Sequence, residues 1–444
     1  MDISIKPLTD GLNGTISAPP SKSYSHRAFI AASLAKESSI IKNPLYSGDV
    51  NVTIEILKKL GVSISKQGKA EYCIRKKSKK FNPTYKILDV KNSGTSIRIF
   101  TALSLLIDKG LSLKGEFFRR RRPIKPLLNA LERLGGKYEL MGDQLHIERS
   151  KNTCADISIR GDISSQFLTA LFFLCPIINC DKKKFIKLDL KTPLRSYPYI
   201  KITLDVLESF GIIIQEHLTR KRKGSFKIPL NQEYVPTTFK VPGDFSSASF
   251  IIAATVLSPH SSNVVIKNLD LKNPQGDKRI IEILKKMGAN LKYNLKSNTL
   301  QITNNSSHSR LKGCSIDCGD IPDLFPILSV LGAFSENKME LYNACHLRMK
   351  ESDRITVMRR ELNKMGIKAE EKEDGLIIIP SEQVKGAIFN HENDHRIAMA
   401  LTIASLYADT PSIIKNIEVI KDSYPNFLKD LKRLGAIITN KGNK

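Results

Sequence analysis

The segment EILKKLGVSI (residues 55–64) has a near copy, EILKKMGANL (residues 282–291), in the other half of the chain. In both copies, apolar residues at helical spacing stop at a glycine, which is typical of the left-handed residue that closes a helix. A strand-like apolar stretch follows. Weaker copies occur elsewhere, and the six glycines are Gly61, Gly135, Gly211, Gly288, Gly366 and Gly435. The chain is therefore predicted to contain six copies of one structural unit.

A second element recurs ahead of each glycine-ended helix. It is apolar on nearly all sides and should form a buried helix. Each copy starts with a residue whose side chain can accept hydrogen bonds from the unpaired N–H groups of a first helical turn. These starting residues are Ser25, Thr95, Ser164, Ser246, Asp323 and Asp394. Each unit is thus predicted to combine two helices with several short strands.

This repetition predicts an α/β fold. Six copies could form a solenoid or two groups of three. The segment KIPLNQEYVPTTFKVPGD (residues 227–244) contains three prolines and is typical of a crossing between domains. We therefore expect one domain over residues 21–239 and a second built from residues 1–20 plus 240–444. A chain that simply divides near residue 239 is the plainer alternative.

The composition is that of a soluble globular protein. The chain has 444 residues, of which 41% are hydrophobic and 26% charged. It contains no apolar run of about 18 residues that would span a membrane. The N-terminus lacks the apolar core of a signal peptide, so we expect a cytoplasmic protein with no membrane partner. Its seven cysteines are scattered, and free thiols in a reducing compartment are the expected state.

The net charge of +26 is compatible with two kinds of partner. Phosphate contacts dominate nucleic-acid binding, and the segment RRRRPIK (residues 119–125) is a dense basic cluster. The chain has no Trp, however, and no RNA-binding or zinc-finger motif, and its lysines are spread along the whole length. A positive field also steers small anionic substrates, so the charge does not decide between these partners.

Cations gather at the starts of several predicted buried helices. Lys22 and Arg27 stand at the first, Arg98 at the second and Arg396 at the last. The N-terminus of a helix carries partial positive charge and disfavours cations, so this pattern opposes the intrinsic preference. A ligand with several negative charges would reverse that balance, and convergent helix N-termini would form an anion site.

Two acids lie in this basic setting. Asp323 starts an apolar helix, where a cap would explain it, and Glu351 lies between Lys350 and Arg354, where an ion pair would explain it. Either carboxylate could instead transfer protons in a pocket of cations. The residues alone leave both interpretations open.

A family resemblance adds to this reading. In chain order, the motifs PSKSYSHR, KNSGTSIR, RRPI, SSQF, SYPYI, IPDLFP, LRMKESDR and NDHRIAM resemble the 5-enolpyruvylshikimate-3-phosphate synthase family of aromatic amino acid biosynthesis. The resemblance covers almost the whole chain. It implies a two-domain inside-out α/β barrel with three βαβαββ units per domain, whose buried parallel helices point their N-termini at the interdomain cleft.

The resemblance also implies a reaction. The enolpyruvyl group of phosphoenolpyruvate would move onto the 5-hydroxyl of shikimate 3-phosphate, with release of phosphate and with no metal or organic cofactor. The enzyme would be a cytoplasmic monomer. Asp323 would be the base at the 5-hydroxyl, and Glu351 would protonate the methylene carbon with help from Lys22.

The matching positions supply the substrate contacts that the resemblance implies. Shikimate 3-phosphate would be held by Lys22, Ser23, Arg27, Ser164, Ser165, Gln166, Ser196, Tyr199, Asp323 and Lys350. Phosphoenolpyruvate would be held by Lys22, Asn92, Gly94, Arg122, Gln166, Arg354, Arg396 and Lys421.

Three positions depart from the family pattern. The stretch KDSYPNF has Asp422 where Lys is usual, so either a contact is lost or Lys421 replaces it. His346 stands where Asn or another polar residue is common. Ile99 replaces a frequent Pro, but Gly94 is kept. Glyphosate should therefore still inhibit in competition with phosphoenolpyruvate, but Ile99 could loosen the loop and weaken this inhibition.

Three rival functions remain open. The sister enolpyruvyl transferase acting on UDP-N-acetylglucosamine shares the fold, but it carries a reactive Cys in the loop that corresponds to EFFRRRRPI (residues 116–124), where this chain has none. A nucleic-acid-binding protein would use the basic cluster, and Asp422 makes an inactive scaffold conceivable. The resemblance favours two small-molecule substrates and no nucleic acid.

Overall fold

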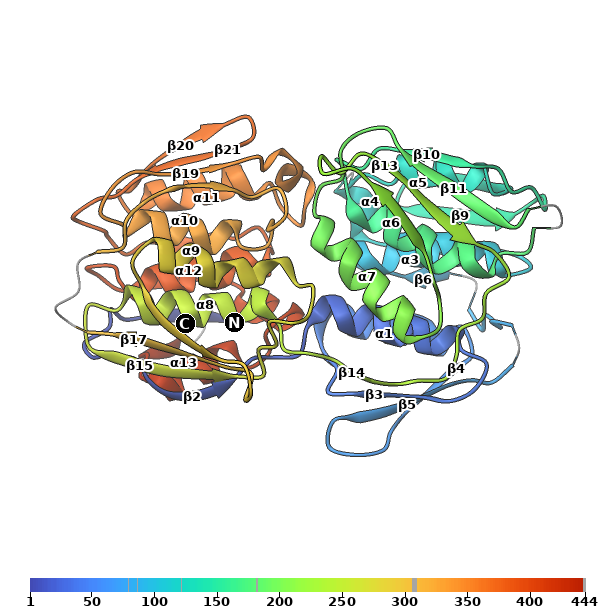
Figure 1. Ribbon diagram of the computed structural model, residues 1–444. Helices are drawn as coiled ribbons and strands as arrows, with labels where there is room; N and C mark the ends of the chain where they lie inside the picture. The colour runs from blue at the N-terminus through green and yellow to red at the C-terminus, as the bar shows by residue number, and fades with distance from the viewer. Residues whose placement is uncertain (79, 86, 121, 181–182, 306–309, 442–444) are drawn as a thin grey trace. The chain divides into compact units, whose positions relative to one another are not determined.

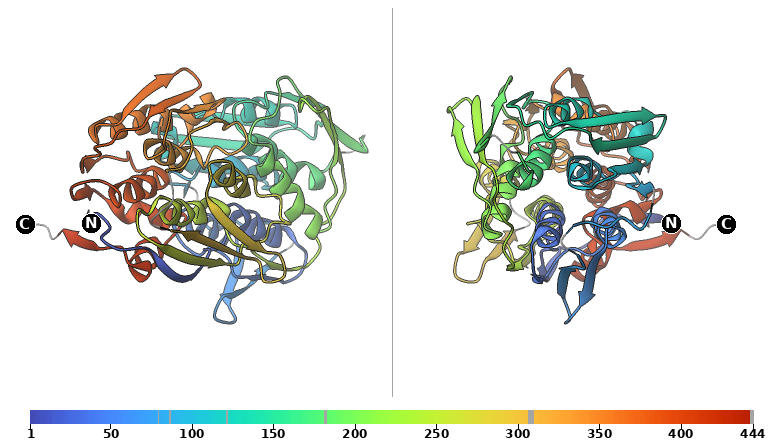
Figure 2. Two further views of the ribbon diagram at one scale, coloured as in Figure 1. Left: turned by 60° about the vertical axis from the view of Figure 1, so that its left-hand side comes forward. Right: turned by 90° about the vertical axis from the view of Figure 1, so that its right-hand side faces the viewer.

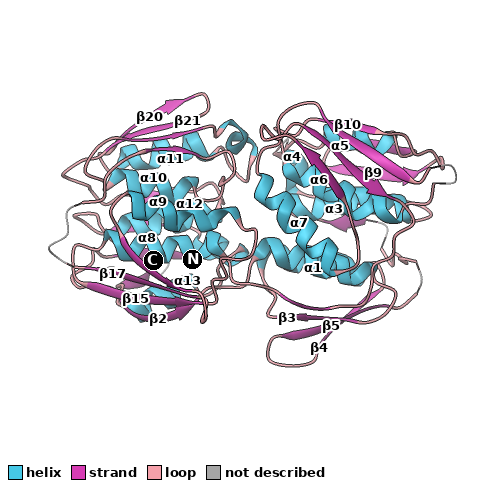
Figure 3. Ribbon diagram, viewed as in Figure 1, coloured by secondary structure: helices cyan, strands magenta, loops and turns pink. Residues whose placement is uncertain are grey.

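The computed structural model describes residues 1–78, 80–85, 87–120, 122–180, 183–305 and 310–441 (Figure 1). The chain divides into two compact units, which we call unit 1 (residues 1–21 and 242–444) and unit 2 (residues 22–241). Both units mix helices with short strands (Figure 3), so the predicted α/β class is confirmed. No described helix is both long and apolar enough to cross a membrane.

Unit 2 is built around apolar helices. The right-hand view of Figure 2 looks nearly along their axes, with strands around them. α3 packs on α6, and α1 packs on α7. The helices are α1 (Lys22–Leu34), α2 (Gly48–Lys59), α3 (Gly94–Leu103), α4 (Glu116–Arg119), α5 (Lys125–Glu132), α6 (Ser165–Leu174) and α7 (Tyr197–Ser209), with 3-10 turns η1 (Ser104–Leu106) and η2 (Cys175–Ile177).

The strands of unit 2 form four-stranded sheets of one design. Their orders are β14-β3-β5-β4, β6-β7-β9-β8 and β10-β11-β13-β12, and in each the first pair is parallel and the others antiparallel. The strands are β3 (Ser39–Lys42), β4 (Val62–Lys66), β5 (Glu71–Lys76), β6 (Ile87–Asp89), β7 (Leu111–Lys114), β8 (Gly136–Met141), β9 (Gln144–Arg149), β10 (Ile157–Ile159), β11 (Phe185–Leu190), β12 (Gln215–Leu218), β13 (Gly224–Pro229) and β14 (Thr238–Lys240). From β6 to β9 the order of the longer elements is βαβαββ.

Unit 1 repeats this design. α8, α10 and α12 contact one another in its interior, and Figure 1 shows them running side by side between the sheets. Its helices are α8 (Phe245–Leu257), α9 (Arg279–Lys286), α10 (Phe325–Ala333), α11 (Arg354–Lys364), α12 (His395–Ser405) and α13 (Phe427–Leu434), with 3-10 turns η3 (Gly276–Lys278), η4 (Cys345–Met349) and η5 (Ile417–Asp422).

The N-terminal strands complete two sheets of unit 1. The sheet orders are β22-β23-β1-β24, β16-β17-β15-β2 and β18-β19-β21-β20, so β1 lies between two C-terminal strands and β2 lies beside β15. The strands are β1 (Asp2–Ile5), β2 (Asn13–Ser17), β15 (Ser262–Lys267), β16 (Asn290–Asn294), β17 (Thr299–Asn304), β18 (Ser315–Asp317), β19 (Met339–Tyr342), β20 (Lys368–Lys372), β21 (Gly375–Ile379), β22 (Ile388–Phe389), β23 (Ser412–Ile414) and β24 (Ile438–Lys441).

Each unit has its own hydrophobic core. In unit 1 the core includes both sides of α8, where Phe250, Ile251 and Ile252 are fully buried. In unit 2 it includes Phe167 and Phe172 of α6, also fully buried. Each such side chain stabilises the fold by about 1.5–3 kcal/mol relative to exposure. This explains why these helices are apolar on nearly all sides, as the sequence predicted.

The predicted helix ends are confirmed, and the predicted starts only in part. All six repeat glycines have positive φ, from 80° at Gly211 to 123° at Gly435. Ser164 and Asp394 cap α6 and α12 as expected. The remaining starts differ, because α1 begins at Lys22, ahead of Ser25, and the caps of α3 and α8 are Ser93 and Asp244. Asp323 does not cap α10 through its side chain.

One expectation about cysteine is wrong. Cys154 and Cys180 form a disulfide in unit 2, with their Cα atoms 5.9 Å apart. The other five cysteines are free thiols, as expected. The pair is separated by 26 residues, and it is the packing of the segment after β9 against the segment after η2 that brings the sulfurs together. No local spacing in the sequence signals it.

Candidate functional site

Three apolar helices of unit 2 begin with predicted site residues. Ser93 caps α3 by accepting a hydrogen bond from the Ser96 N–H, and Ser164 caps α6 by accepting one from the Gln166 N–H, both at 3.3 Å. The first N–H groups of a helix lack partners within the helix and carry partial positive charge, so these ends favour an anion. The predicted residues in these first turns are Lys22, Ser23, Gly94, Ser165 and Gln166.

Gln166 joins the first turns of α6 and α3. Its side-chain NH₂ donates to the Thr95 hydroxyl at 3.0 Å, and its side-chain oxygen accepts a hydrogen bond from Arg98. Arg98 is buried, and its other terminal nitrogen donates to the Pro123 carbonyl at 2.7 Å. The amide of Gln166 is therefore oriented from both ends, and its second N–H and second lone pair are the groups that could contact a substrate.

Arg122 reaches the first turn of α3 from the segment before α5. Its Nη1 donates to the backbone carbonyl of Asn92 at 2.9 Å, and its guanidinium lies 5.2 Å from the ring centre of Phe117. A Cβ placed on Gly94 would lie 2.6 Å from Arg122 Nη2. The structure thus brings Asn92, Gly94 and Arg122 together, with glycine leaving room for the guanidinium. Arg121, also in the basic cluster, lies outside the described residues.

Arg27 ties α1 to its neighbours. Its Nε donates to the Thr203 hydroxyl of α7 at 2.8 Å, and its Nη1 donates to the Ser23 carbonyl at 2.8 Å. The side chain is buried, and this burial lowers the pKa of the guanidinium to about 10. Ser196, which precedes α7, is in the left-handed conformation with φ 54°, and its carbonyl accepts a hydrogen bond from the Tyr199 N–H. These contacts group four predicted residues of unit 2 around the starts of α1 and α7.

Lys22 has an acidic partner within unit 2. Its Nζ lies 2.9 Å from Asp49 Oδ2 of α2, and both side chains are mostly buried. In the next turn of α1, His26 Nδ1 contacts the Thr53 hydroxyl at 2.7 Å. Burial lowers the pKa of His26 to about 3, so this imidazole is neutral at physiological pH. His26 therefore adds no positive charge to that of Lys22 at the start of α1.

Arg354 is the centre of the charged cluster in unit 1. It is 1% exposed, and three carboxylates surround its guanidinium: Asp394 at 2.8 Å, Asp323 at 2.8 Å and Glu351 at 3.0 Å. Burial alone would lower its pKa, but the three carboxylates outweigh burial and hold the pKa well above its usual value. A permanently charged guanidinium thus fixes both predicted proton-transfer acids, Asp323 and Glu351, in one place.

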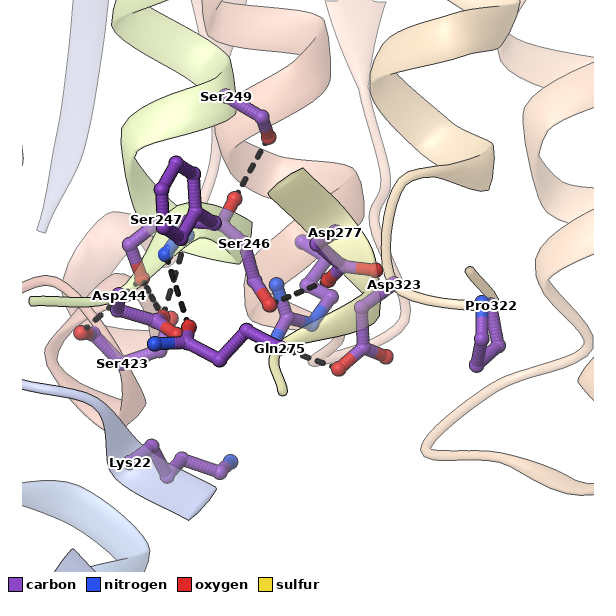
Figure 4. Close-up of polar contacts among 12 residues, drawn as sticks. Lys22, Asp244, Ser246, Ser247, Ser249, Gln275, Asp277, Pro322, Asp323 and Ser423 are labelled. Carbon is purple, nitrogen blue, oxygen red and sulfur yellow. Dashed lines mark hydrogen bonds and ion pairs between the residues drawn. The ribbon is translucent and has the colours of Figure 1, made fainter. Parts of the chain in front are cut away.

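Asp323 is held from two sides instead of capping its helix. One carboxylate oxygen pairs with Arg354, and the other lies 2.8 Å from Arg396 Nη2 of α12. Figure 4 shows Asp323 facing the first turn of α8, where Asp244, Ser246 and Asp277 gather. The prediction of a helix cap is therefore wrong for this residue, because its carboxylate binds two arginines. Arg354 and Arg396, both predicted phosphoenolpyruvate ligands, meet at this carboxylate.

The remaining predicted residues of unit 1 lie near this cluster in the chain. Lys350 and Glu351 follow η4 and are only partly buried, with the Glu351 side chain 21% exposed, so both can reach a ligand. His346 is buried within η4. Lys421 is exposed in η5, next to Asp422.

A cavity of about 540 Å³ lies at the other end of the unit 1 helices. Leu257 ends α8, and Phe334 and Leu406 directly follow α10 and α12; all three line the cavity. None of the predicted site residues lines it. Among the residues that the structure describes, no group of three or more His, Cys, Asp and Glu side chains is placed to hold a metal ion.

Comparison with known proteins identifies the family. The family model described as EPSP synthase (3-phosphoshikimate 1-carboxyvinyltransferase) matches residues 8–431. The chain belongs to the EPSP synthase family. The resemblance predicted from the motifs is therefore confirmed.

Relatives and solved structures of the EPSP synthase family match along nearly the whole chain. A 3-phosphoshikimate 1-carboxyvinyltransferase from Methanocaldococcus jannaschii is 44% identical over 443 residues, covering 99% of both chains. One of the same name from Clostridium novyi is 37% identical over 443 residues, covering 98% of both. A solved EPSP synthase from Acinetobacter baumannii superposes with a TM-score of 0.78 at 24% identity, covering 99% of this chain and 100% of that one. This likeness supports the two-domain α/β fold.

Several contacts of these clusters were not predicted from the sequence. Asp394 was expected only as a helix cap, yet it also pairs with Arg354. Asp49 pairs with Lys22, and Asp277 accepts a hydrogen bond from Ser246. Each partner lies 27 or more residues away in the chain, so no local motif marks these pairs. For Asp49 one signal was present: it is the first acid of α2, the helix that follows the one beginning with Lys22.

Proposed function

We propose that this chain transfers the enolpyruvyl group of phosphoenolpyruvate to the 5-hydroxyl of shikimate 3-phosphate and releases phosphate. Membership of the EPSP synthase family and the names of relatives at 37–44% identity support this enzyme activity on small-molecule substrates. The alternative acceptor, UDP-N-acetylglucosamine, is not favoured by these comparisons. The observation that carries the proposal within the structure is the buried Arg354 that binds Asp323 and Glu351 together.

The reaction is an addition followed by an elimination. In the addition, the substrate hydroxyl oxygen bonds to C2 of phosphoenolpyruvate, its proton passes to Asp323, and the methylene carbon receives a proton from Glu351, assisted by Lys22. In the elimination, the bond from C2 to the phosphate oxygen breaks, a methyl proton returns to Glu351, and the proton held by Asp323 passes to the leaving phosphate. Phosphate leaves with its charge stabilised by cations. No metal or organic cofactor takes part in the proposed steps.

The proposed contacts draw on helix starts in both units. For phosphoenolpyruvate, unit 2 supplies Arg122, Gln166 and the Gly94 amide, and unit 1 supplies Arg354 and Arg396. Buried arginines with fixed donors suit an anionic group, because they need little reorganisation on binding. Shikimate 3-phosphate would be held by Ser23, Arg27, Ser164, Ser165, Ser196 and Tyr199 of unit 2, with Lys22, Gln166, Asp323 and Lys350.

Two further proposals concern the state of the protein. We place it in the cytoplasm as a monomer. The described helices contain no membrane span, and the two units are each compact around their own core.

Steady-state release of phosphate from phosphoenolpyruvate tests the proposed function. With shikimate 3-phosphate as acceptor we expect turnover, and with UDP-N-acetylglucosamine none. Asp323→Ala and Glu351→Gln should each lower kcat by about 100-fold or more, the usual contribution of a positioned acid or base. Glu382→Gln, an exposed acid at the mouth of the remote cavity, is the matched control and should leave kcat unchanged. Turnover with the UDP-sugar alone would refute the choice of acceptor.

A further inference from the structure

A buried carboxyl with no assigned role lies beside Asp323. Asp277 is in η3, at the start of α9, and is 2% exposed. The Ser246 hydroxyl donates a hydrogen bond to its Oδ2, whereas its buried Oδ1 has no hydrogen-bond partner among the described residues. Figure 4 shows Asp277 close to Asp323. Burying half of a carboxyl without a partner is costly, so a structural role alone does not account for this arrangement.

The charged groups and the hydroxyl that face Asp277 come from several elements of unit 1. Asp244 and Ser246 belong to the start of α8, Asp323 precedes α10, and Arg396 lies in the first turn of α12. Cys318, which follows β18, also interacts with it. Arg396 is therefore shared, because it pairs directly with Asp323 and also attracts the charge of Asp277.

The protonation of Asp277 changes near neutral pH. Burial and the charge of Asp323 raise the pKa of Asp277 to about 7, against the opposing pull of Arg396 and the Ser246 hydrogen bond. Below that pH, Asp277 is neutral and adds no charge beside Asp323 and Arg396. Above it, a second negative charge acts on the same arginine and repels the charge of Asp323. Asp323 then holds a transferred proton more strongly.

We propose that Asp277 is a positioning residue for enolpyruvyl transfer, which tunes the basicity of Asp323 through the charge that it adds beside this carboxylate and Arg396. The inference rests on the proposed function, in which Asp323 accepts the proton of the 5-hydroxyl. Asp277 itself exchanges no proton with substrate. Ionisation of Asp277 makes Asp323 a better base, and the rate therefore rises as pH passes through neutrality.

The pH profile of kcat between about pH 5.5 and 9 tests this role. The wild-type protein should show a rise centred near the pKa of Asp277, about 7. Asp277→Asn keeps the size of the side chain and an acceptor for Ser246 but carries no charge. We expect its profile to lose this rise, with kcat equal to wild type within about twofold below pH 6 and roughly tenfold lower above pH 8, the effect of about one pKa unit. A purely structural role would lower kcat equally at all pH values.

Ser246→Ala is the companion variant, because it keeps the charge of Asp277 and removes the hydrogen bond that lowers its pKa. Its rise in kcat should persist and move to higher pH.

Parallel profiles for wild type, Asp277→Asn and Ser246→Ala would overturn the inference, as would a wild-type profile that is flat around pH 7. If Asp323→Ala lost activity but the three profiles were parallel, the proposed function would stand and only the role of Asp277 would fall. Full activity of Asp323→Ala would overturn both. Thermal unfolding shows whether Asp277→Asn and Ser246→Ala fold. If one of them does not, the pH profile of the other is compared with wild type to test the role of Asp277.

Discussion

Arg354 shows how one buried residue organises the acids of unit 1. Its guanidinium is 1% exposed and binds three carboxylates. Removing one partner from a buried ion pair leaves uncompensated charge, which typically destabilises a protein by about 3–5 kcal/mol. We therefore expect Arg354→Met to lower the midpoint of thermal unfolding by several degrees and to abolish phosphate release.

The matched control for Arg354 is Arg359→Met on the same helix. Arg359 is 40% exposed and pairs with Glu371 at 3.1 Å, so removing this pair should lower the free energy of unfolding by less than about 1 kcal/mol. Differential scanning calorimetry compares both variants with the wild type. Equal midpoints for Arg354→Met and Arg359→Met would contradict the central place given to Arg354.

Gly94 should control the fit of phosphoenolpyruvate. A Cβ at this position would lie 2.6 Å from Arg122 Nη2 and 3.0 Å from Arg98 Nη1, so Gly94→Ala must displace a guanidinium. Displacing the Arg122 guanidinium should weaken a proposed contact with phosphoenolpyruvate, so we expect the KM for phosphoenolpyruvate to rise by roughly tenfold or more. The KM for shikimate 3-phosphate should change much less.

The matched control is Gly68→Ala, where a Cβ meets only ordinary contacts at 3.7 Å and beyond; it should leave both KM values unchanged. An unaltered KM in Gly94→Ala would remove Arg122 from the proposed contacts.

At the scale of elements, the disulfide joins two connecting segments of unit 2. Cys154 and Cys180 close a loop of 26 residues, which stabilises a fold by about 3 kcal/mol in the chain-entropy model. We expect dithiothreitol to lower the thermal midpoint of the wild-type protein but not that of Cys154→Ser. Cys73→Ser, which removes a free thiol, should still respond to the reductant. Alkylation of the protein unfolded in denaturant without reductant, read by mass spectrometry, should label five of the seven cysteines; seven labelled thiols would contradict the disulfide.

Local patterns predicted the elements better than their partners. The six glycines that end helices were predictable because positive φ after an apolar helix is a local property, and all six have it. The pairing of Asp323 with Arg354 was not predictable from the sequence. Arg354 lies 31 residues away in the chain and reaches Asp323 only when α10 and α11 pack. The same holds for Cys154 and Cys180. Asp277 was missed because burial, which no spacing reveals, gives it its unusual chemistry.

At the scale of the whole molecule, the proposed site residues come from two units with separate cores. The first turns of α1, α3 and α6 belong to unit 2, and those of α10 and α12 belong to unit 1. If one reaction uses the helix starts of both units, binding of the two substrates must protect backbone amides in both units together. A binding protein that used only the basic surface of one unit would not show this coupling.

Hydrogen exchange followed by mass spectrometry measures this coupling most directly. The Glu351→Gln variant allows phosphoenolpyruvate and shikimate 3-phosphate to bind with little turnover. The two substrates together should slow exchange of backbone amides at the first turns of α1, α3 and α6 in unit 2 and of α12 in unit 1. Protection restricted to one unit, or protection only around the cavity at the far ends of α8, α10 and α12, would contradict the claim that these helix starts hold the two phosphorylated substrates.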